Sequence, residues 1–102
     1  MKRAIKALIT RNRAIYNHFG YHTQLFKLQE ECIELVHAIG DYREHASSDN
    51  LHAMMSEVAD VLLVSLQFWL VSPLVRLICR QKLDRTEERV KSGFYEKTSH
   101  RF

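Results

Sequence analysis

Five carboxylates occur in two short patterns inside sequence that is otherwise apolar and helix-forming. The first pattern, E-E-x-x-E, is formed by Glu30, Glu31 and Glu34, and the second, E-x-x-D, by Glu57 and Asp60. Charged groups in apolar surroundings are costly unless an opposite charge compensates them. Hard oxygen ligands in this number suit Mg²⁺ or Mn²⁺, whereas zinc prefers nitrogen and sulfur. The two patterns therefore predict a divalent metal site.

The composition indicates what kind of scaffold positions these acids. The chain has 102 residues, enough for one domain with a single hydrophobic core. Because it contains only three glycines and one proline, a few long elements are expected, and with them an all-α fold. The formal net charge of +3 suits a polyphosphate substrate as well as nucleic acid, so the charge alone decides neither.

Helical periodicity predicts four helices, over about residues 2–18, 23–39, 51–71 and 73–91. Gly20 and Gly40 are expected to end the first two helices, and Thr23 to cap the start of the second. The polar stretch 41–50 is predicted to be a loop. Together the four helices predict a four-helix-bundle-like domain.

Two further caps are expected in the second half of the chain. Ser48 or Asp49 would cap the third helix, because both side chains can accept a hydrogen bond from an unpaired backbone N–H. Ser72 followed by Pro73 has the order of an N-cap and a first helical residue. Gly93 would end the fourth helix.

The second predicted helix has an apolar face and a polar face side by side. The apolar face carries Leu25, Leu28, Cys32, Leu35, Val36 and Ile39. The polar face beside it carries Gln24, Lys27, Glu31 and Glu34. Glu30 lies one step further round, towards solvent. We therefore expect Glu31 and Glu34 to border the core and Glu30 to stand outside it.

The third predicted helix is apolar almost all round. Its few strongly polar side chains, Glu57, Asp60 and Gln67, fall on one side. A domain of this size has difficulty covering such a helix alone, so we expect a homo-oligomer, a dimer or a tetramer.

Side chains three residues apart point the same way from a helix, so each helix presents one pair of acids. Antiparallel packing of the second and third helices would bring Glu31, Glu34, Glu57 and Asp60 into one small volume. Without a cation, carboxylates this close would raise one another's pKa. Glu30 could equally be an ordinary surface glutamate. Glu57 and Asp60 are surrounded by valine and leucine in the sequence, so a surface role does not suit them.

The sequence around both acid patterns resembles a known family. QLFKLQEECIEL, which contains Gln24, Lys27 and the first pattern, and SEVADVLL, which contains the second, are similar to the signature of the MazG-like all-α nucleoside triphosphate pyrophosphohydrolases. Lys82-x-x-Arg85 resembles the basic stretch that follows in short, phage-type members. The resemblance extends over about residues 20–89.

The resemblance implies a Mg²⁺-dependent enzyme, with Mn²⁺ as an alternative, that cleaves (d)NTPs between the α and β phosphates in nucleotide-pool housekeeping. The metal ligands it implies are Glu31, Glu34, Glu57 and Asp60. Glu30 would contact the metal ligands without binding the metal itself, or it would orient the attacking water. Cationic side chains would hold the leaving pyrophosphate, Lys27 first and then Lys82 and Arg85, with Gln24 also facing substrate. The alternatives are a salt bridge from Lys27 to Glu31 and an ordinary solvated face for Lys82 and Arg85.

Two other classes compete with this hypothesis. A di-iron bundle needs E-x-x-H on two helices, and only Glu34 and His37 match, because the second acid pair has no histidine. A catalytically weak helical bundle that binds nucleotide or nucleic acid would keep the acids without turnover. Metal-dependent turnover would distinguish the enzyme from this binding protein. For the enzyme we expect no nucleic-acid partner.

The remaining sequence features indicate a cytoplasmic protein. Cys32 and Cys79 lie in apolar helical sequence without C-x-x-C spacing, which predicts two buried thiols in a reducing compartment. No apolar region with a cleavage site follows the basic start of the chain, so no signal peptide is expected. The apolar run Val61–Val71 is shorter than the roughly 20 residues that a membrane span needs, so no membrane partner is expected.

Overall fold

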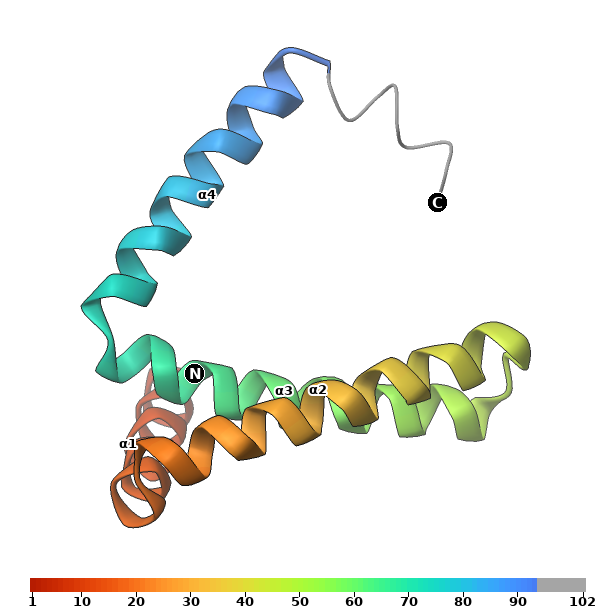
Figure 1. The fold of residues 1–102 in the computed structure, drawn as a ribbon, viewed down its shortest axis with the longest axis horizontal. Helices are drawn as coiled ribbons and strands as arrows, with labels where there is room; N and C mark the ends of the chain where they lie inside the picture. Colours follow the sequence, from red (N-terminus) through yellow and green to blue (C-terminus); the bar gives the residue numbers. More distant parts are fainter. Residues whose placement is uncertain (94–102) are drawn as a thin grey trace. The chain divides into compact units, whose positions relative to one another are not determined.

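Four α-helices form the computed structural model, which describes residues 1–93 (Figure 1). They are α1 (Lys2–Phe19), α2 (Tyr21–Glu44), α3 (Ser48–Val71) and α4 (Pro73–Lys91). No strand occurs within this range, so the all-α prediction is confirmed. The four predicted helices all exist, although the second differs from the prediction at both ends and the third begins earlier, at Ser48.

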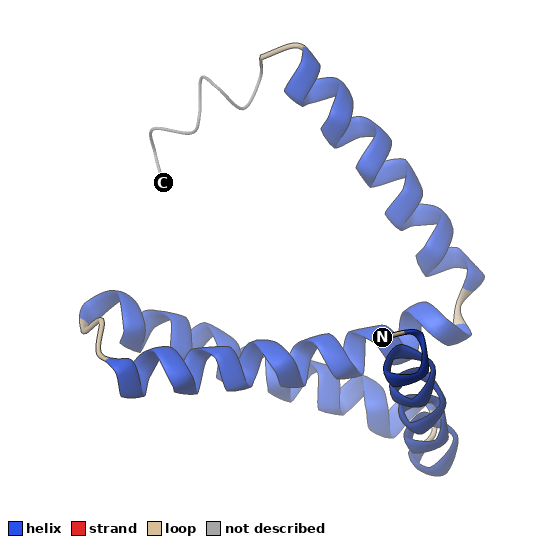
Figure 2. Cartoon of the chain, turned by 180° about the vertical axis from the view of Figure 1, so that it is seen from behind, coloured by secondary structure: helices blue, strands red, loops and turns tan. Residues whose placement is uncertain are grey.

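The chain divides into two compact units, Met1–Leu70 and Val71–Phe102. In the first unit α2 and α3 run antiparallel, side by side, and α1 crosses them near the start of α2 and the end of α3 (Figures 1 and 2). In the second unit α4 is the described helix. The single four-helix domain remains a prediction.

The start of α2 differs from its prediction. Thr23 does not cap this helix, because Gly20 alone separates α1 from α2, with φ of 85°. This left-handed backbone conformation favours glycine, which lets the chain change direction within a single residue. The predicted end of the first helix at Gly20 is confirmed.

The end of α2 also lies further along the chain than the sequence predicts. The helix passes through Gly40 and ends at Glu44, so only residues 45–47 connect it to α3, where a loop over 41–50 was expected. A glycine inside a helix costs about 1 kcal/mol relative to alanine, which the rest of a long helix can offset. The polar side chains after Gly40 reflect an exposed helical turn and not a loop.

Serine side chains cap the two later helices. Ser47 Oγ accepts a hydrogen bond from the backbone N–H of Asn50 at 3.0 Å, so the cap of α3 lies one residue before the predicted Ser48 or Asp49. Ser72 Oγ accepts from the backbone N–H of Val75 at 3.2 Å, and Pro73 is the first residue of α4. The predicted Ser-Pro start of α4 is therefore confirmed.

The buried residues of residues 1–93 are mostly polar. Val64 is the one buried hydrophobic residue in that range, beside the buried polar residues Asn12, Gln24, Glu31 and Gln67. The predicted apolar face of α2 is only partly covered, since Val36 is 68% exposed. The prediction of buried thiols is wrong: Cys32 is exposed because α1 and α3 cover only part of the circumference of α2, and Cys79 is exposed on α4, the one described helix of its unit.

Helix α3 is longer than the apolar run within it. Its 24 residues are long and apolar enough to cross a membrane, and it is the one such helix among residues 1–93. The prediction considered only Val61–Val71, which leaves out the first half of the helix with Glu57 and Asp60. Core helices of soluble proteins have the same length and composition, so this property assigns no compartment.

Candidate metal site and adjoining pocket

Three carboxylates from two helices meet in the first unit. Glu31 comes from α2, and Glu57 and Asp60 come from α3. One oxygen of each lies within 4.8 Å of an oxygen of the other two. The antiparallel packing of α2 and α3 brings them together, because Glu57 and Asp60 point from the same face of α3. We call these three residues the carboxylate trio.

Two oxygens of the trio are buried without a hydrogen-bond partner. They are Oε2 of Glu31 and Oε2 of Glu57, and the Glu31 residue is only 4% exposed. Buried polar atoms are nearly always paired, because leaving one unpaired costs free energy comparable to a lost hydrogen bond. Carboxylate oxygens converging from two helices fit a hard divalent cation such as Mg²⁺ or Mn²⁺. The donor set therefore suits the metal that the sequence predicts.

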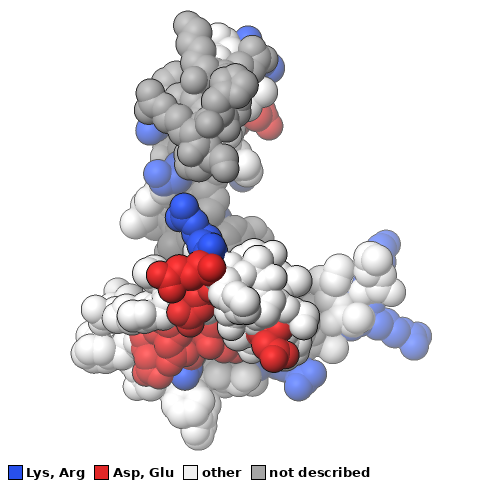
Figure 3. Space-filling model, turned by 90° about the vertical axis from the view of Figure 1, so that its right-hand side faces the viewer, with Lys and Arg blue, Asp and Glu red and all other residues white. Residues whose placement is uncertain are grey.

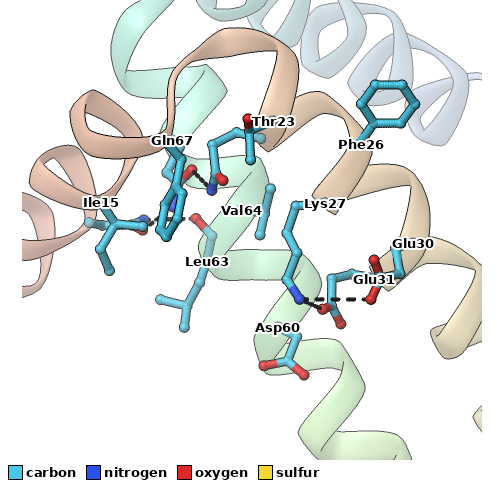
Figure 4. A pocket seen from close by; sticks show the side chains of 13 residues that line it. Ile15, Thr23, Phe26, Lys27, Glu30, Glu31, Asp60, Leu63, Val64 and Gln67 are labelled. Carbon is cyan, nitrogen blue, oxygen red and sulfur yellow. Dashed lines mark hydrogen bonds and ion pairs between the residues drawn. The ribbon is translucent and has the colours of Figure 1, made fainter.

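A lysine lies against the trio. The Nζ of Lys27 is 2.8 Å from Oε1 of Glu31 and 3.9 Å from Oε1 of Glu30 (Figure 4). The hydrogen bond from Lys27 holds the pKa of the Glu31 carboxyl below its ordinary value, although burial acts in the opposite direction. The same hydrogen bond, together with the negative charge of Glu31, raises the pKa of Lys27. Both groups are therefore held in their charged forms.

Glu34 and Glu30 lie outside the trio. Glu34 is exposed, where the sequence predicts that it borders the core. The pKa of its carboxyl is nevertheless raised by the trio. The charge of Glu31 has the largest effect, followed by partial loss of hydration and then by the charge of Glu57. The Glu30 side chain is 62% exposed, in agreement with its predicted place towards solvent. The structure thus brings together three of the four predicted metal ligands and places Glu34 beside them.

A pocket of about 530 Å³ adjoins the trio between α1, α2 and α3 (Figure 4). Its lining is mainly apolar, and Glu31 and Asp60 form part of it. The other residues that line it are Asn12, Ile15, Phe19, Thr23, Gln24, Phe26, Lys27, Glu30, Leu63, Val64 and Gln67. One elongated ligand could therefore contact the carboxylates at one end and apolar side chains at the other.

Three amide side chains form a buried chain of hydrogen bonds along the pocket. Asn12 Nδ2 donates to the backbone oxygen of Leu63 at 2.7 Å, Gln67 Nε2 donates to Asn12 Oδ1 at 2.7 Å, and Gln24 Nε2 donates to Gln67 Oε1 at 2.7 Å. We call Asn12, Gln67 and Gln24 the amide chain. Sequence reasoning missed Asn12, although a polar residue between Ile9 and Ile15 interrupts the apolar face of α1 and could have signalled it.

The charged residues of the first unit are divided between helices. Every acidic residue among residues 1–70 lies on α2 or α3, and α1 carries only basic ones. Acidic side chains gather on one side when the molecule is viewed from the end that carries the α2–α3 loop (Figure 3). Lys82 and Arg85 lie on α4, in the second unit, so their predicted role in binding phosphate remains a prediction.

Comparisons with known proteins leave the family open. No family model matches the chain, and no curated protein or solved structure is similar enough to count as a match. The MazG-like resemblance therefore rests on the residues of the two acid patterns and the sequence around them.

Proposed function

We propose that this protein is a divalent-metal-dependent nucleoside triphosphate pyrophosphohydrolase. The observation that carries the proposal is the carboxylate trio, with buried oxygens of Glu31 and Glu57 that lack a hydrogen-bond partner. Such oxygens are accounted for if a cation binds them. The resemblance of both acid patterns to the MazG-like signature supports the choice of reaction.

Each residue of the site has a task in this proposal. Glu31, Glu57 and Asp60 would hold Mg²⁺ or Mn²⁺, and Glu34 would support them from beside the trio. When bound, the metal neutralises phosphate charge and lowers the pKa of a bound water. Glu30 lies on the solvent side and orients the attacking water. Lys27 is close enough to the trio to exchange its pairing with Glu31 for a phosphate oxygen.

The pocket supports a nucleotide as the substrate. A nucleoside triphosphate combines an anionic end, which needs the metal and Lys27, with a flat, partly apolar base. The pocket offers both environments, since Asp60 and Glu31 line the same cavity as Phe19 and Leu63. Cleavage between the α and β phosphates, giving (d)NMP and pyrophosphate, follows from the resemblance, as does a role in housekeeping of the cytoplasmic nucleotide pool.

The exposed apolar surface supports a homo-oligomer. Leu62 on α3 is 63% exposed and Phe26 on α2 is 72% exposed, whereas Val64 is the one buried hydrophobic residue of residues 1–93. A chain of this size gains most of its stability from apolar burial, so a second copy would supply the missing cover. A bilayer is the less favourable cover for α3, because Glu57 and Asp60 would then lie near hydrocarbon.

Product analysis tests the proposed function. The full chain is incubated with Mg²⁺ and a panel of NTPs and dNTPs, and products are separated by ion-exchange chromatography. Monophosphate plus pyrophosphate, lost with a chelator and in Glu57→Gln but kept in Glu44→Gln, is the expected result. Glu44 is an exposed acid of α2 outside the trio, so it controls for a general loss of charge. Diphosphate plus orthophosphate would contradict the cleaved bond, and no turnover with Mg²⁺ or Mn²⁺ would favour a nucleotide-binding protein.

A further inference from the structure

The direction of the amide chain is set at one end by the backbone. A backbone carbonyl can only accept hydrogen bonds, so the atom of Asn12 that lies 2.7 Å from the Leu63 oxygen must be its NH₂ group. This orientation leaves Oδ1 of Asn12 to face Gln67, which must present its own NH₂ group in return. An amide side chain has one donor end and one acceptor end, so each orientation fixes the next.

The same logic fixes the orientation of Gln24. Since the NH₂ group of Gln67 faces Asn12, its Oε1 accepts from Nε2 of Gln24 at 2.7 Å. The carbonyl oxygen of Gln24 is therefore the atom that remains for another partner, and no hydrogen bond to it is found within the described part of the chain. Gln24 is only 4% exposed and lines the pocket beside the trio. The Gln24 carbonyl oxygen is thus a hydrogen-bond acceptor in the pocket, and its orientation is fixed by the chain of hydrogen bonds that begins at the Leu63 carbonyl.

The surroundings of this acceptor favour a flat ligand that carries an N–H group. Apolar side chains of Ile15, Phe19 and Leu63 line the same pocket. Gln24 precedes Glu31 by seven residues, so the two lie about 10 Å apart along α2. A nucleoside monophosphate has a comparable length, with its sugar and phosphate at one end and the pairing edge of its base at the other.

We propose that Gln24 determines specificity by accepting a hydrogen bond from an N–H group on the pairing edge of a nucleobase. Asn12 and Gln67 are positioning residues that keep the Gln24 carbonyl turned towards the base. This inference rests on the proposed function in taking the ligand to be a nucleotide. All unmodified bases carry such an N–H group, so the contact selects nucleotides with a free pairing edge over those that are methylated there.

The test uses nucleosides, which lack phosphate and therefore need neither metal nor turnover. The ¹⁵N-labelled full chain is titrated with thymidine or N3-methylthymidine, and with adenosine or purine riboside, while the side-chain amide resonances of Gln24 and Gln67 are followed. Thymidine and adenosine should shift these resonances and bind about three- to tenfold more tightly than their partners, as one hydrogen bond predicts. Gln29→Leu, at an exposed position of the same helix, should keep this preference.

The variant Asn12→Leu tests the positioning role. It removes the acceptor for Gln67 and frees that amide to rotate, so the preference within each nucleoside pair should fall while thymidine still binds. Equal binding of both members of each pair to the wild-type chain would overturn the inference, as would no binding of either unmodified nucleoside. Discrimination without pyrophosphate release would leave the inference standing and the proposed function overturned. Pyrophosphate release without discrimination between the nucleosides of each pair would support the proposed function and overturn the inference about Gln24.

Discussion

The ammonium group of Lys27 lies 2.8 Å from Oε1 of Glu31, at the edge of a cluster of three carboxylates. Of the two oxygens of Glu31, Oε1 pairs with this lysine and Oε2 is buried without a hydrogen-bond partner. The metal hypothesis and the phosphate hypothesis therefore share a residue, because the lysine that pairs with the acid also lines the pocket proposed for the nucleotide.

The carboxylate trio should bind Mn²⁺, and loss of either α3 acid should weaken binding. Glu57→Gln and Asp60→Asn are each expected to weaken binding at least tenfold, since even groups that only orient metal ligands contribute about 10–100-fold. The measurement is titration with Mn²⁺ followed by electron paramagnetic resonance of the free ion. Glu44→Gln is the matched control and should bind as the wild type does. Equal affinity in all three variants would place the metal elsewhere.

Removing the charge of Lys27 should raise the pKa of Glu31. The hydrogen bond and charge of Lys27 hold that pKa below the ordinary 4.5, against the effect of burial. In Lys27→Met the largest influence that lowers this pKa is lost and the burial that raises it stays, so the Glu31 carboxyl should titrate at higher pH. Carbon-13 NMR of the side-chain carboxyl measures this directly. An unchanged titration curve would show that the ion pair does not form in solution.

Glu34 should titrate above 4.5, mainly because the charge of Glu31 raises its pKa. A raised pKa means that the folded state holds this proton more tightly than the unfolded state. The stabilising contribution is therefore complete below pH 4.5 and lost as the pH rises through the raised pKa. Glu34→Gln should accordingly be more stable than the wild type at neutral pH and equally stable at low pH, as urea unfolding at both pH values would show. A larger difference at low pH would contradict the assignment.

The amide chain should contribute to the stability of the first unit. Asn12→Ala removes the side-chain hydrogen bond to the Leu63 carbonyl and leaves the NH₂ group of Gln67 without its acceptor, and such a loss costs about 1–3 kcal/mol in the free energy of unfolding. Gln67→Ala should cost a similar amount. Gln29→Ala is the control, because this side chain is exposed on α2. Equal midpoints of urea unfolding for all four proteins would mean that the chain of amides adds nothing.

The cap of α3 should depend on Ser47 and not on Ser48. Ser47→Ala removes the acceptor for the Asn50 N–H group and should cost about 1 kcal/mol. Ser48→Ala should have little effect, because alanine is a better helix former than serine. Amide hydrogen exchange at Asn50 and Leu51 checks both variants. Faster exchange in Ser48→Ala than in Ser47→Ala would restore the cap position predicted from the sequence.

Sequence alone determined the local part of this protein. Periodicity within one helix depends only on the fixed rotation per residue, so the four helices and the shared face of Glu57 and Asp60 could be predicted. The outward position of Glu30 followed from the same rule. Local rules were weaker at Gly40, because a long helix can tolerate a residue that would end a short one.

The tertiary structure decided what lies next to what. Asn12 and Gln67 are 55 residues apart, and their contact depends on how α1 crosses α3, which no local pattern records. The same crossing buries Gln24 and forms the pocket. Packing of α2 against α3 buries Glu31 and leaves Glu34 exposed, although both lie on one predicted face. The geometry of a helix fixes the direction of each side chain about the helix axis, but the burial of that side chain depends on where the neighbouring helices lie.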